Sequence, residues 1–246
     1  MKQQADFESL KREAAAAALS LVEDEMVVGL GTGSTAKHFI DLLGQAVAAG
    51  ELRGVTGVPT SRASESQALG LGIKLIELPA AGIDMTVDGM DEVAVTNGRL
   101  DAVKGLGGAL LREKIVASAA ATFVLIGDDS KLVSHLGEKS PLPVEVARFG
   151  WQRTLRLLED LSAESSGADS HVKLRSTGSE PYVTDNGGLI VDCYMPAGYD
   201  AATLAAALDA TPGVVGHGLF LGIAARAFLA GDGRVRELAA EREATL

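Results

Sequence analysis

The sequence DMTVDGMDEV, residues 84–93, brings Asp84, Asp88, Asp91 and Glu92 together directly after an apolar run. Carboxylates this close repel one another, and burial would make each of them harder to ionise. Ligands of open α/β sheets gather at the carboxyl ends of parallel strands, and a strand over 83–87 would end here. Asp88 and Asp91 flank a Gly-Met step, so both could face one cavity, bind hydroxyl groups and move protons. The alternative is an Asp-Gly turn whose carboxylates are solvated.

A lysine precedes a glycine-rich turn and a helix start in KGLGGALLREK, residues 104–114. Such a turn could direct Lys104 toward a developing oxyanion. Glu113 lies on the helix that follows, between Arg112 and Lys114. Taken alone, these charges are typical of a loop followed by a solvated helix face.

The segment GLGTGSTA, residues 29–36, lies between an expected strand and an expected helix. Its glycines let backbone N–H groups face an anion, and Ser34 and Thr35 add hydroxyls near the helix N-terminus. A tight turn capped by Ser or Thr explains the same residues. The segment matches neither a Walker A loop nor GxGxxG, so ATP and NAD are not favoured.

The remaining polar residues offer few further sites. DDSKLV, residues 128–133, adds Lys131 at the same expected sheet edge. The four His are dispersed without zinc-ligand spacing, and no Gly-x-Ser-x-Gly nucleophile motif occurs. A metal site is therefore not expected. Cys193 is the single cysteine, which excludes an intramolecular disulfide and fits a reducing compartment.

Composition restricts the class of protein. The 246 residues are 47% hydrophobic and 22% charged, which is ordinary for a globular chain of one large or two unequal domains. A net charge of −11 argues against nucleic-acid and anionic membrane surfaces. The N-terminus lacks a signal-peptide pattern and no apolar run approaches a membrane span, so we expect a cytoplasmic protein.

Apolar runs and periodicity predict the elements that would hold these residues. We expect helices over 7–21, 37–49, 63–70, 110–120, 151–161 and 201–208, and strands over 26–30, 55–58, 73–78, 83–87, 123–126, 171–174 and 189–194. Their alternation up to about residue 136 predicts a parallel sheet covered on both faces. The polar segment SAESSGADS, residues 162–170, is expected to be a surface loop. The apolar runs in GVVGHGLF and ARAFLAG could add strands to the first sheet.

Taken in order, the segments GLGTGSTA, GVPTSRAS, TVDGMDEV, KGLGGALLREK, DDSKLV, LPVEV and VTDNGG resemble ribose-5-phosphate isomerases of the A type. The resemblance covers most of the chain from Gly29 to Gly188. It implies an α/β fold, a Rossmann-like parallel-sheet domain over 1–136 and 212–246, with an inserted ferredoxin-like α+β domain over 137–211. It also implies a homodimer or homotetramer of the pentose phosphate pathway that needs no organic cofactor and no metal.

The resemblance also implies roles for individual residues. Glu113 would be the general base that moves a proton between adjacent carbons through an ene-diolate, and a pKa raised to roughly 6–7 would suit it. Lys104 would stabilise negative charge on oxygen, Asp88 would handle the ring-opening proton, and Asp91 would bind hydroxyls. Asp84 has no assigned role. The implied substrate contacts are Thr32, Gly33, Ser34, Thr35, Asp88, Gly89, Met90, Asp91, Lys104, Gly105, Leu106, Gly107 and Lys131.

Two substitutions depart from the family pattern. Leu106 stands where a third consecutive glycine is common, so the turn could be shaped differently, and Leu111 replaces a frequent Thr. The polar segment 162–170 is also longer than expected. Two alternative functions remain: a CoA transferase with a Glu nucleophile, and the sugar-phosphate sensor domain of a repressor. The motifs fit the first poorly, and about 25 residues before Met26 are too few for the DNA-binding helices of the second.

Overall fold

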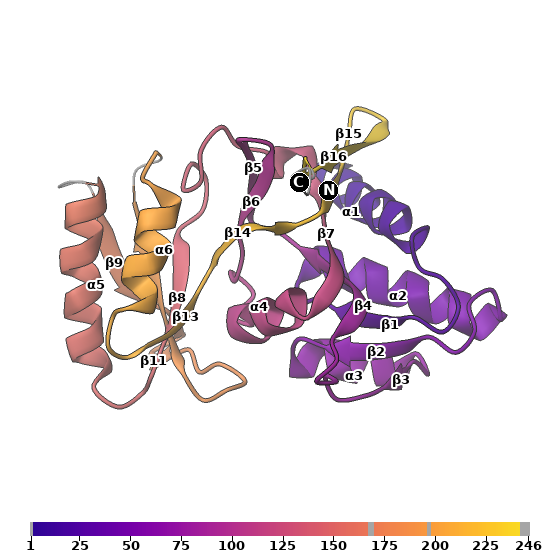
Figure 1. Ribbon diagram of the computed structural model, residues 1–246, viewed down its shortest axis with the longest axis horizontal. Coiled ribbons are helices and arrows are strands. Elements are labelled where there is room, and N and C mark those ends of the chain that lie inside the picture. The colour runs from indigo at the N-terminus through magenta and orange to yellow at the C-terminus, as the bar shows by residue number, and fades with distance from the viewer. Residues whose placement is uncertain (1, 167–169, 196–197, 242–246) are drawn as a thin grey trace, which may run out of the picture.

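The computed structural model describes residues 2–166, 170–195 and 198–241, and shows a larger and a smaller α/β unit with a short sheet between them (Figure 1). The larger unit contains a seven-stranded sheet in the order β16-β15-β7-β4-β1-β2-β3, parallel except for the edge strand β16. Its strands are β1 (Val27–Leu30), β2 (Thr56–Pro59), β3 (Lys74–Leu75), β4 (Ile83–Gly89), β7 (Ala120–Asp128), β15 (Arg226–Gly231) and β16 (Arg234–Ala239).

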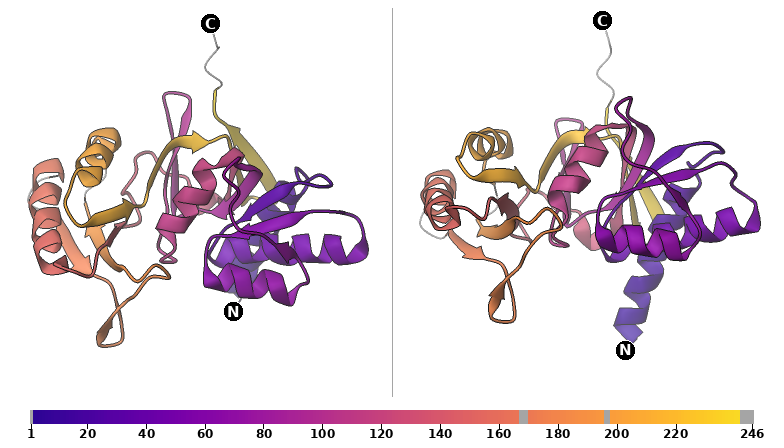
Figure 2. Two further views of the ribbon diagram at one scale, coloured as in Figure 1. Left: turned by 60° about the horizontal axis from the view of Figure 1, so that its bottom comes forward. Right: turned by 90° about the horizontal axis from the view of Figure 1, so that it is seen from below.

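Helices cover both faces of this sheet, because the central strands are apolar on both sides. One face is covered by α1 (Lys2–Leu19), α2 (Ser34–Ala49) and α3 (Arg62–Gly70), whose buried side chains pack with those of β1 and β4. The other face is covered by α4 (Leu110–Ser118) and by the short sheet. Helix α4 therefore lies between the seven-stranded sheet and the smaller unit, as Figure 2 shows.

The smaller unit is an antiparallel sheet in the order β13-β8-β12-β9, with two helices packed on it (Figure 1). Its elements are β8 (Leu142–Val146), α5 (Trp151–Ser166), β9 (His171–Leu174), β12 (Leu189–Tyr194), α6 (Ala201–Asp209) and β13 (Val214–His217), with a hairpin of β10 (Ser176–Thr177) and β11 (Glu180–Pro181). The short sheet joins β14 (Leu219–Ala224), β6 (Arg99–Val103) and β5 (Glu92–Thr96), and a 3-10 turn η1 covers Asp129–Lys131.

The predicted fold class, a Rossmann-like sheet with a smaller α+β unit, is confirmed. The domain boundaries stay a prediction, and the four-stranded sheet includes β13, which lies beyond residue 211. The loop expected over 162–170 is wrong in its first part, because α5 continues to Ser166 with Ser162 buried against the sheet. Residues 167–169 lie outside the described part of the chain.

The C-terminal apolar runs join three different sheets. Only β15 and its partner β16 extend the seven-stranded sheet, whereas β13 joins the smaller unit and β14 joins the short sheet. The β5–β6 hairpin was not expected from the sequence. Because β6 ends next to Lys104, this hairpin carries one of the predicted site residues.

Candidate active site

The carboxyl end of β4 holds Asp88 in a fixed position. The side chain is fully buried, and its Oδ1 accepts hydrogen bonds from the backbone N–H groups of Thr32, at 3.0 Å, and Gly89, at 2.7 Å. Gly31 must be a glycine here, since a Cβ would lie 2.3 Å from Asp88 Oδ1. These contacts therefore fix the end of the strand, the loop before α2 and the aspartate relative to one another.

Lys104 lies between two buried carboxylates. It follows β6, and its Nζ lies 3.0 Å from Asp88 Oδ2 and 3.6 Å from Glu113 Oε1. The same ammonium donates a 2.6 Å hydrogen bond to the carbonyl of Gly89 and lies 5.6 Å from the ring centre of Phe220. Within the described residues, Oε2 of Glu113 has no hydrogen-bond partner. The arrangement leaves one carboxylate oxygen available to a substrate.

Burial and charge set the protonation of this group. Burial, reinforced by the charge of Asp88 and opposed by that of Lys104, raises the pKa of Glu113 to about 8, which is above the expected 6–7. Burial also raises the pKa of Asp88 against the opposing charge of Lys104. Burial alone would lower the pKa of Lys104, but the charges of Asp88 and Glu113 outweigh it and raise that pKa. Lys104 is therefore a cation at neutral pH, and Glu113 can exchange a proton.

The lysine-glycine turn is held by Asp91. The N–H of Gly108 donates to the carbonyl of Gly105 at 2.9 Å, and the N–H of Leu106 donates to Asp91 Oδ2 at 2.9 Å. Positive φ angles of 105° at Gly105 and 83° at Gly108 explain the glycines at these two positions. Leu106 has no positive φ and its side chain is largely exposed, so its departure from the family pattern causes no backbone strain.

The loop before α2 presents the amino end of a helix. Gly33 begins the helix with φ 108°, and no side chain caps the free N–H groups of the first turn. The hydroxyl of Thr32 lies 2.7 Å from Thr60 Oγ1 and donates to Ser61 Oγ at 2.8 Å, which fixes the loop from behind. An uncapped helix N-terminus with its partial positive charge is a favourable site for a phosphate.

These elements surround one cavity of about 170 Å³. The structure brings together in its wall nearly every site residue expected from the sequence. They are Thr32, Gly33, Ser34, Thr35, Gly89, Met90, Asp91, Lys104, Gly105, Gly107, Glu113 and Lys131. Asp88 lies fully buried beneath Lys104, and the exposed Leu106 contributes its backbone to the turn.

Two further lining residues were missed from the sequence. Lys11 reaches the cavity from α1, where it is also paired with Glu8 at 2.6 Å, and Asp128 lies at the end of β7 beside Lys131. The position of Asp128 at a strand end was a usable signal. Lys11 had no signal, because nothing in a charged N-terminal helix shows which side chain will face the α2 terminus.

Known proteins resemble this chain over most of its length. A family model for ribose 5-phosphate isomerase A (phosphoriboisomerase A) matches residues 56–234. A protein named ribose-5-phosphate isomerase A from Deinococcus radiodurans is 47% identical over 95% of this chain and 99% of its own length. The chain belongs to the ribose 5-phosphate isomerase A family. A probable ribose-5-phosphate isomerase 2 from Arabidopsis thaliana is 45% identical over 92% of this chain and 84% of that protein.

Solved structures of the ribose 5-phosphate isomerase A family share the whole fold. Ribose 5-phosphate isomerase from Plasmodium falciparum superposes with a TM-score of 0.90 at 34% identity, covering 96% of this chain and all of that one. A D-ribose-5-phosphate isomerase in complex with phospho-erythronic acid gives 0.87 at 36% identity, covering 95% of this chain and 99% of that one. These findings confirm the predicted family and enzyme class, an isomerase.

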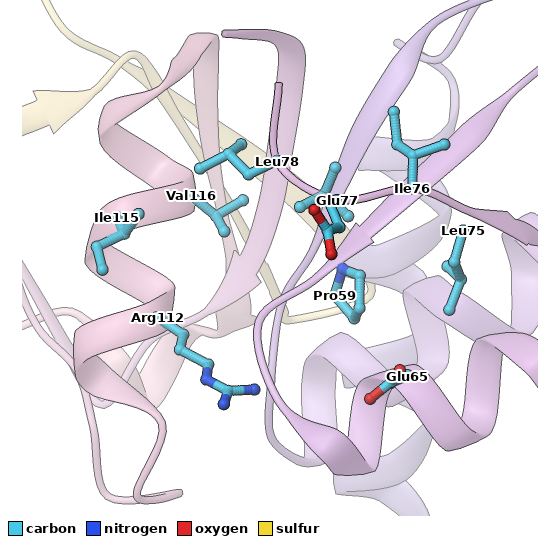
Figure 3. Close-up of a pocket in the computed structure, with 10 residues that line it drawn as sticks. Pro59, Glu65, Leu75, Ile76, Glu77, Leu78, Arg112, Ile115 and Val116 are labelled. Carbon is cyan, nitrogen blue, oxygen red and sulfur yellow. The ribbon is translucent and has the colours of Figure 1, made fainter. Parts of the chain in front are cut away.

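A second cavity, of about 470 Å³, lies between α4 and the β2–α3 part of the larger unit (Figure 3). Arg112 and Ile115 face it from α4, and Glu65 and Glu77 lie across from them among apolar side chains. Arg112 is bound to the smaller unit through Asn186 Oδ1 at 2.8 Å. This cavity is larger than the first but lacks a buried ammonium between carboxylates.

Metal and membrane sites were also considered. Among the described residues, no three His, Cys, Asp or Glu side chains gather in a way that could hold a metal ion. No helix in the described ranges is long and apolar enough to span a membrane. The expectation that this isomerase needs no metal or organic cofactor stays a prediction.

Proposed function

We propose that this chain interconverts ribose 5-phosphate and ribulose 5-phosphate, with Glu113 moving a proton through an ene-diolate. The observation that carries the proposal is the buried Glu113 beside Lys104, which lies 3.6 Å away, in a cavity that also holds an uncapped helix terminus. A sugar phosphate needs both an acid–base group at its carbonyl end and an anion site at its phosphate end. The family relationship supports the same substrate.

The proton transfer requires an ionised Glu113. The carboxylate removes the proton from C2 of the open aldose, the C–H electron pair forms a C1–C2 double bond, and the carbonyl electrons move to the C1 oxygen. Glu113 then returns the proton to C1 as the double-bond electrons move there, the C2 oxygen forms the carbonyl, and the C2 hydroxyl proton passes to the C1 oxygen, which leaves the ketose. Lys104 stabilises the negative charge on oxygen, and loss of one such donor typically slows a reaction about 10²–10³-fold.

The substrate ring must open before this transfer can begin. We assign the ring-opening proton to the Asp88–Lys104 pair, with Lys104 in contact with the substrate because Asp88 lies fully buried behind it. Asp91 lines the cavity and one of its oxygens is held by the Leu106 N–H, so its other oxygen can bind sugar hydroxyls. The acidic residues at the end of β4 thus act at the sugar end of the substrate.

The phosphate would bind at the amino end of α2. The N–H groups after Gly33 and the hydroxyls of Ser34 and Thr35 would hold its oxygens, with Lys11 and Lys131 as nearby cations in the same cavity wall. This local set of donors offsets the net charge of −11. The expectations of a cytoplasmic location, a homodimer or homotetramer, and a role in the non-oxidative pentose phosphate pathway remain part of the proposal.

The test replaces Glu113 with Gln, which keeps the shape and removes the base. We expect turnover of ribose 5-phosphate to fall about 10²–10⁴-fold, the usual contribution of a general base, while phospho-erythronic acid still binds. Glu65→Gln, the same change in the wall of the second cavity, is the control and should retain full turnover. Near-complete activity of the Glu113→Gln enzyme would reject the proton-transfer assignment.

A further inference from the structure

Arg175 connects the smaller unit to the lysine-glycine turn. It lies between β9 and β10, and its Nε donates to Asp192 Oδ2 of β12 at 2.9 Å while Nη2 pairs with Asp192 Oδ1. Its third donor, Nη1, reaches the carbonyl oxygens of Gly105, at 3.1 Å, and Leu106, at 2.9 Å. Four of the five N–H donors of this arginine are therefore used, and two of these bonds end on backbone at the cavity wall.

The peptide between Gly105 and Leu106 is held from both sides. In a planar trans peptide the C=O and N–H groups point in opposite directions, and the described residues contain no cis peptide. Here the Gly105 carbonyl points to Arg175, while the Leu106 N–H points to Asp91 in the cavity wall. Arg175 and Asp91 thus hold opposite ends of one peptide unit.

The same geometry directs the next peptide into the cavity. Because the Leu106 carbonyl is bound by Arg175, the N–H of Gly107 must point the other way, toward the cavity that Gly107 lines. Among the described residues, nothing accepts a hydrogen bond from this N–H. Gly107 is exposed, so its N–H is open to the cavity, and an oriented donor of this kind is suited to an oxygen of a bound ligand.

Tyr182 makes the position of Arg175 more rigid. The guanidinium lies 6.0 Å from the Tyr182 ring centre, and the Tyr182 N–H donates to the Arg175 carbonyl at 2.9 Å. The Tyr182 hydroxyl packs against Gly108, where a Cβ would lie only 2.2 Å from it. The end of the turn is thus fitted against the smaller unit and cannot shift without moving Tyr182.

We propose that Arg175 is a positioning residue of the smaller unit that orients the Gly107 N–H to donate a hydrogen bond to a substrate oxygen at the reacting end. This inference rests on the proposed function and adds a role for the smaller unit in it. In the proposed binding mode the phosphate is already bound by the N–H groups of the α2 terminus. The donor therefore acts on the sugar part of the ligand.

The experiment compares Arg175→Lys and Arg175→Gln with Arg156→Gln. Lysine keeps the charge but cannot serve Asp192 and both carbonyls at once. Arg156 is an exposed arginine of α5 that pairs only with Glu159 and Asp160 in the structure, so its replacement controls for a lost surface charge. Thermal unfolding confirms that each variant is folded, and if Arg175→Gln does not fold, Arg175→Lys gives the result.

The decisive readout is binding of two ligands to each folded protein. Phospho-erythronic acid has a phosphate and a carboxylate, and the carboxylate stands in for the ene-diolate oxygens. Inorganic phosphate lacks the carboxylate. We expect Arg175→Lys to weaken phospho-erythronic acid binding at least tenfold and to leave inorganic phosphate binding unchanged. Equal weakening of both ligands, or of neither, overturns the proposal.

Turnover separates this inference from the proposed function. We expect the Arg175 variants to lose about 10²-fold in kcat, as misplacement of a reacting group typically does, with Arg156→Gln at the wild-type value. If the unaltered protein does not isomerise ribose 5-phosphate, the proposed function fails whatever the variants do. If it does and Arg175→Lys keeps full kcat, only the positioning role is rejected.

Discussion

At the scale of single residues, the site depends on two carboxylates that share one ammonium. Lys104 cannot fully compensate both Asp88 and Glu113 in a buried position, so one of the two carboxyls tends to hold a proton. Asp88 accepts two backbone N–H bonds that favour its charged form, whereas Glu113 Oε2 lacks any bond in the described part of the chain. The pKa of both carboxyls is raised by burial, and Glu113 is the one whose free oxygen faces the cavity, as a reversible proton carrier requires.

This protonation state predicts the pH dependence of the enzyme. A base works only when ionised, and the pKa of Glu113 is raised to about 8 by burial and by Asp88. We expect kcat/KM for ribose 5-phosphate to rise about tenfold per pH unit below pH 8 and to level off above it. Initial rates between pH 5.5 and 9.5 measure this, and a profile that is flat over this range, as a base with the ordinary carboxyl pKa of about 4.3 would give, would contradict it.

Asp88→Asn tests the ring-opening role. Asparagine keeps an oxygen for the N–H groups of Thr32 and Gly89 but cannot exchange a proton. We expect kcat to fall about 10²-fold with ribose 5-phosphate as the substrate. With ribulose 5-phosphate, which cannot close a comparable ring, we expect kcat to fall less. Asp84→Asn is the control, since Asp84 on the same strand accepts the Val27 N–H, at 2.7 Å, and lies outside the lining of the cavity. Equal losses in both directions would reject the role.

The sequence predicted the residues of short motifs better than those that reach the site from afar. Asp88, Lys104 and Glu113 could be found because they lie at the end of β4, directly after β6 and in the first turn of α4, respectively. Lys11 and Arg175 could not be found this way. Each arrives from an element whose placement depends on how the helix or the smaller unit packs, and local spacing does not contain that information.

At the scale of elements, the anion site depends on how α2 begins. Gly33 has φ 108° with open space where a Cβ would stand, and Gly50 ends the same helix with φ 73° and similarly open space. At both positions, any residue with a Cβ would be strained by the positive φ angle alone. Only the first lies in the cavity wall. The helix therefore offers two glycines that differ in function and match in conformation.

Gly33→Ala and Gly50→Ala form a matched pair. Each should destabilise the fold by about 1–2 kcal/mol because alanine is strained at these φ angles. Gly33→Ala should also raise the Kd for inorganic phosphate about tenfold, since misaligning one hydrogen bond to a charged group costs at least about 1.4 kcal/mol. Calorimetric titration measures the difference. Equal phosphate binding by the two variants would place the phosphate elsewhere.

The β5–β6 hairpin shows which features of an element the local sequence predicts and which it does not. Asn97 and Gly98 both have positive φ, at 51° and 76°, which is the geometry of a tight two-residue hairpin turn, and Asn-Gly is its usual sequence. The turn was therefore predictable from residues 92–103. Its pairing with β14 was not, because the strands are separated by more than a hundred residues and by the whole smaller unit.

At the scale of the whole molecule, the chain passes between the two units close to the site. The outward passage includes Gly137, Lys139 and Ser140, whose N–H groups donate to the fully buried Glu92 at 2.6, 2.5 and 2.6 Å. The segment that leads back from the smaller unit contains Gly218, whose carbonyl accepts the Lys104 N–H at 2.9 Å. Movement of one unit against the other would therefore reach Lys104 and the turn that Arg175 holds.

Glu92→Gln tests whether the outward passage stabilises the whole molecule. Glutamine replaces one accepting oxygen with a donor, which leaves at least one buried N–H without a partner and costs about 1–3 kcal/mol. We expect the free energy of unfolding in urea to fall by that amount and limited proteolysis to cut near residues 137–140. Glu138→Gln is the control, because Glu138 is exposed and, within the described ranges, accepts a single N–H, from Ser134, at 3.0 Å. If both variants unfold like the wild type, Glu92 does not hold the two units together, and the coupling between them must reside in other contacts, such as those of Arg175 with the turn and of Arg112 with Asn186.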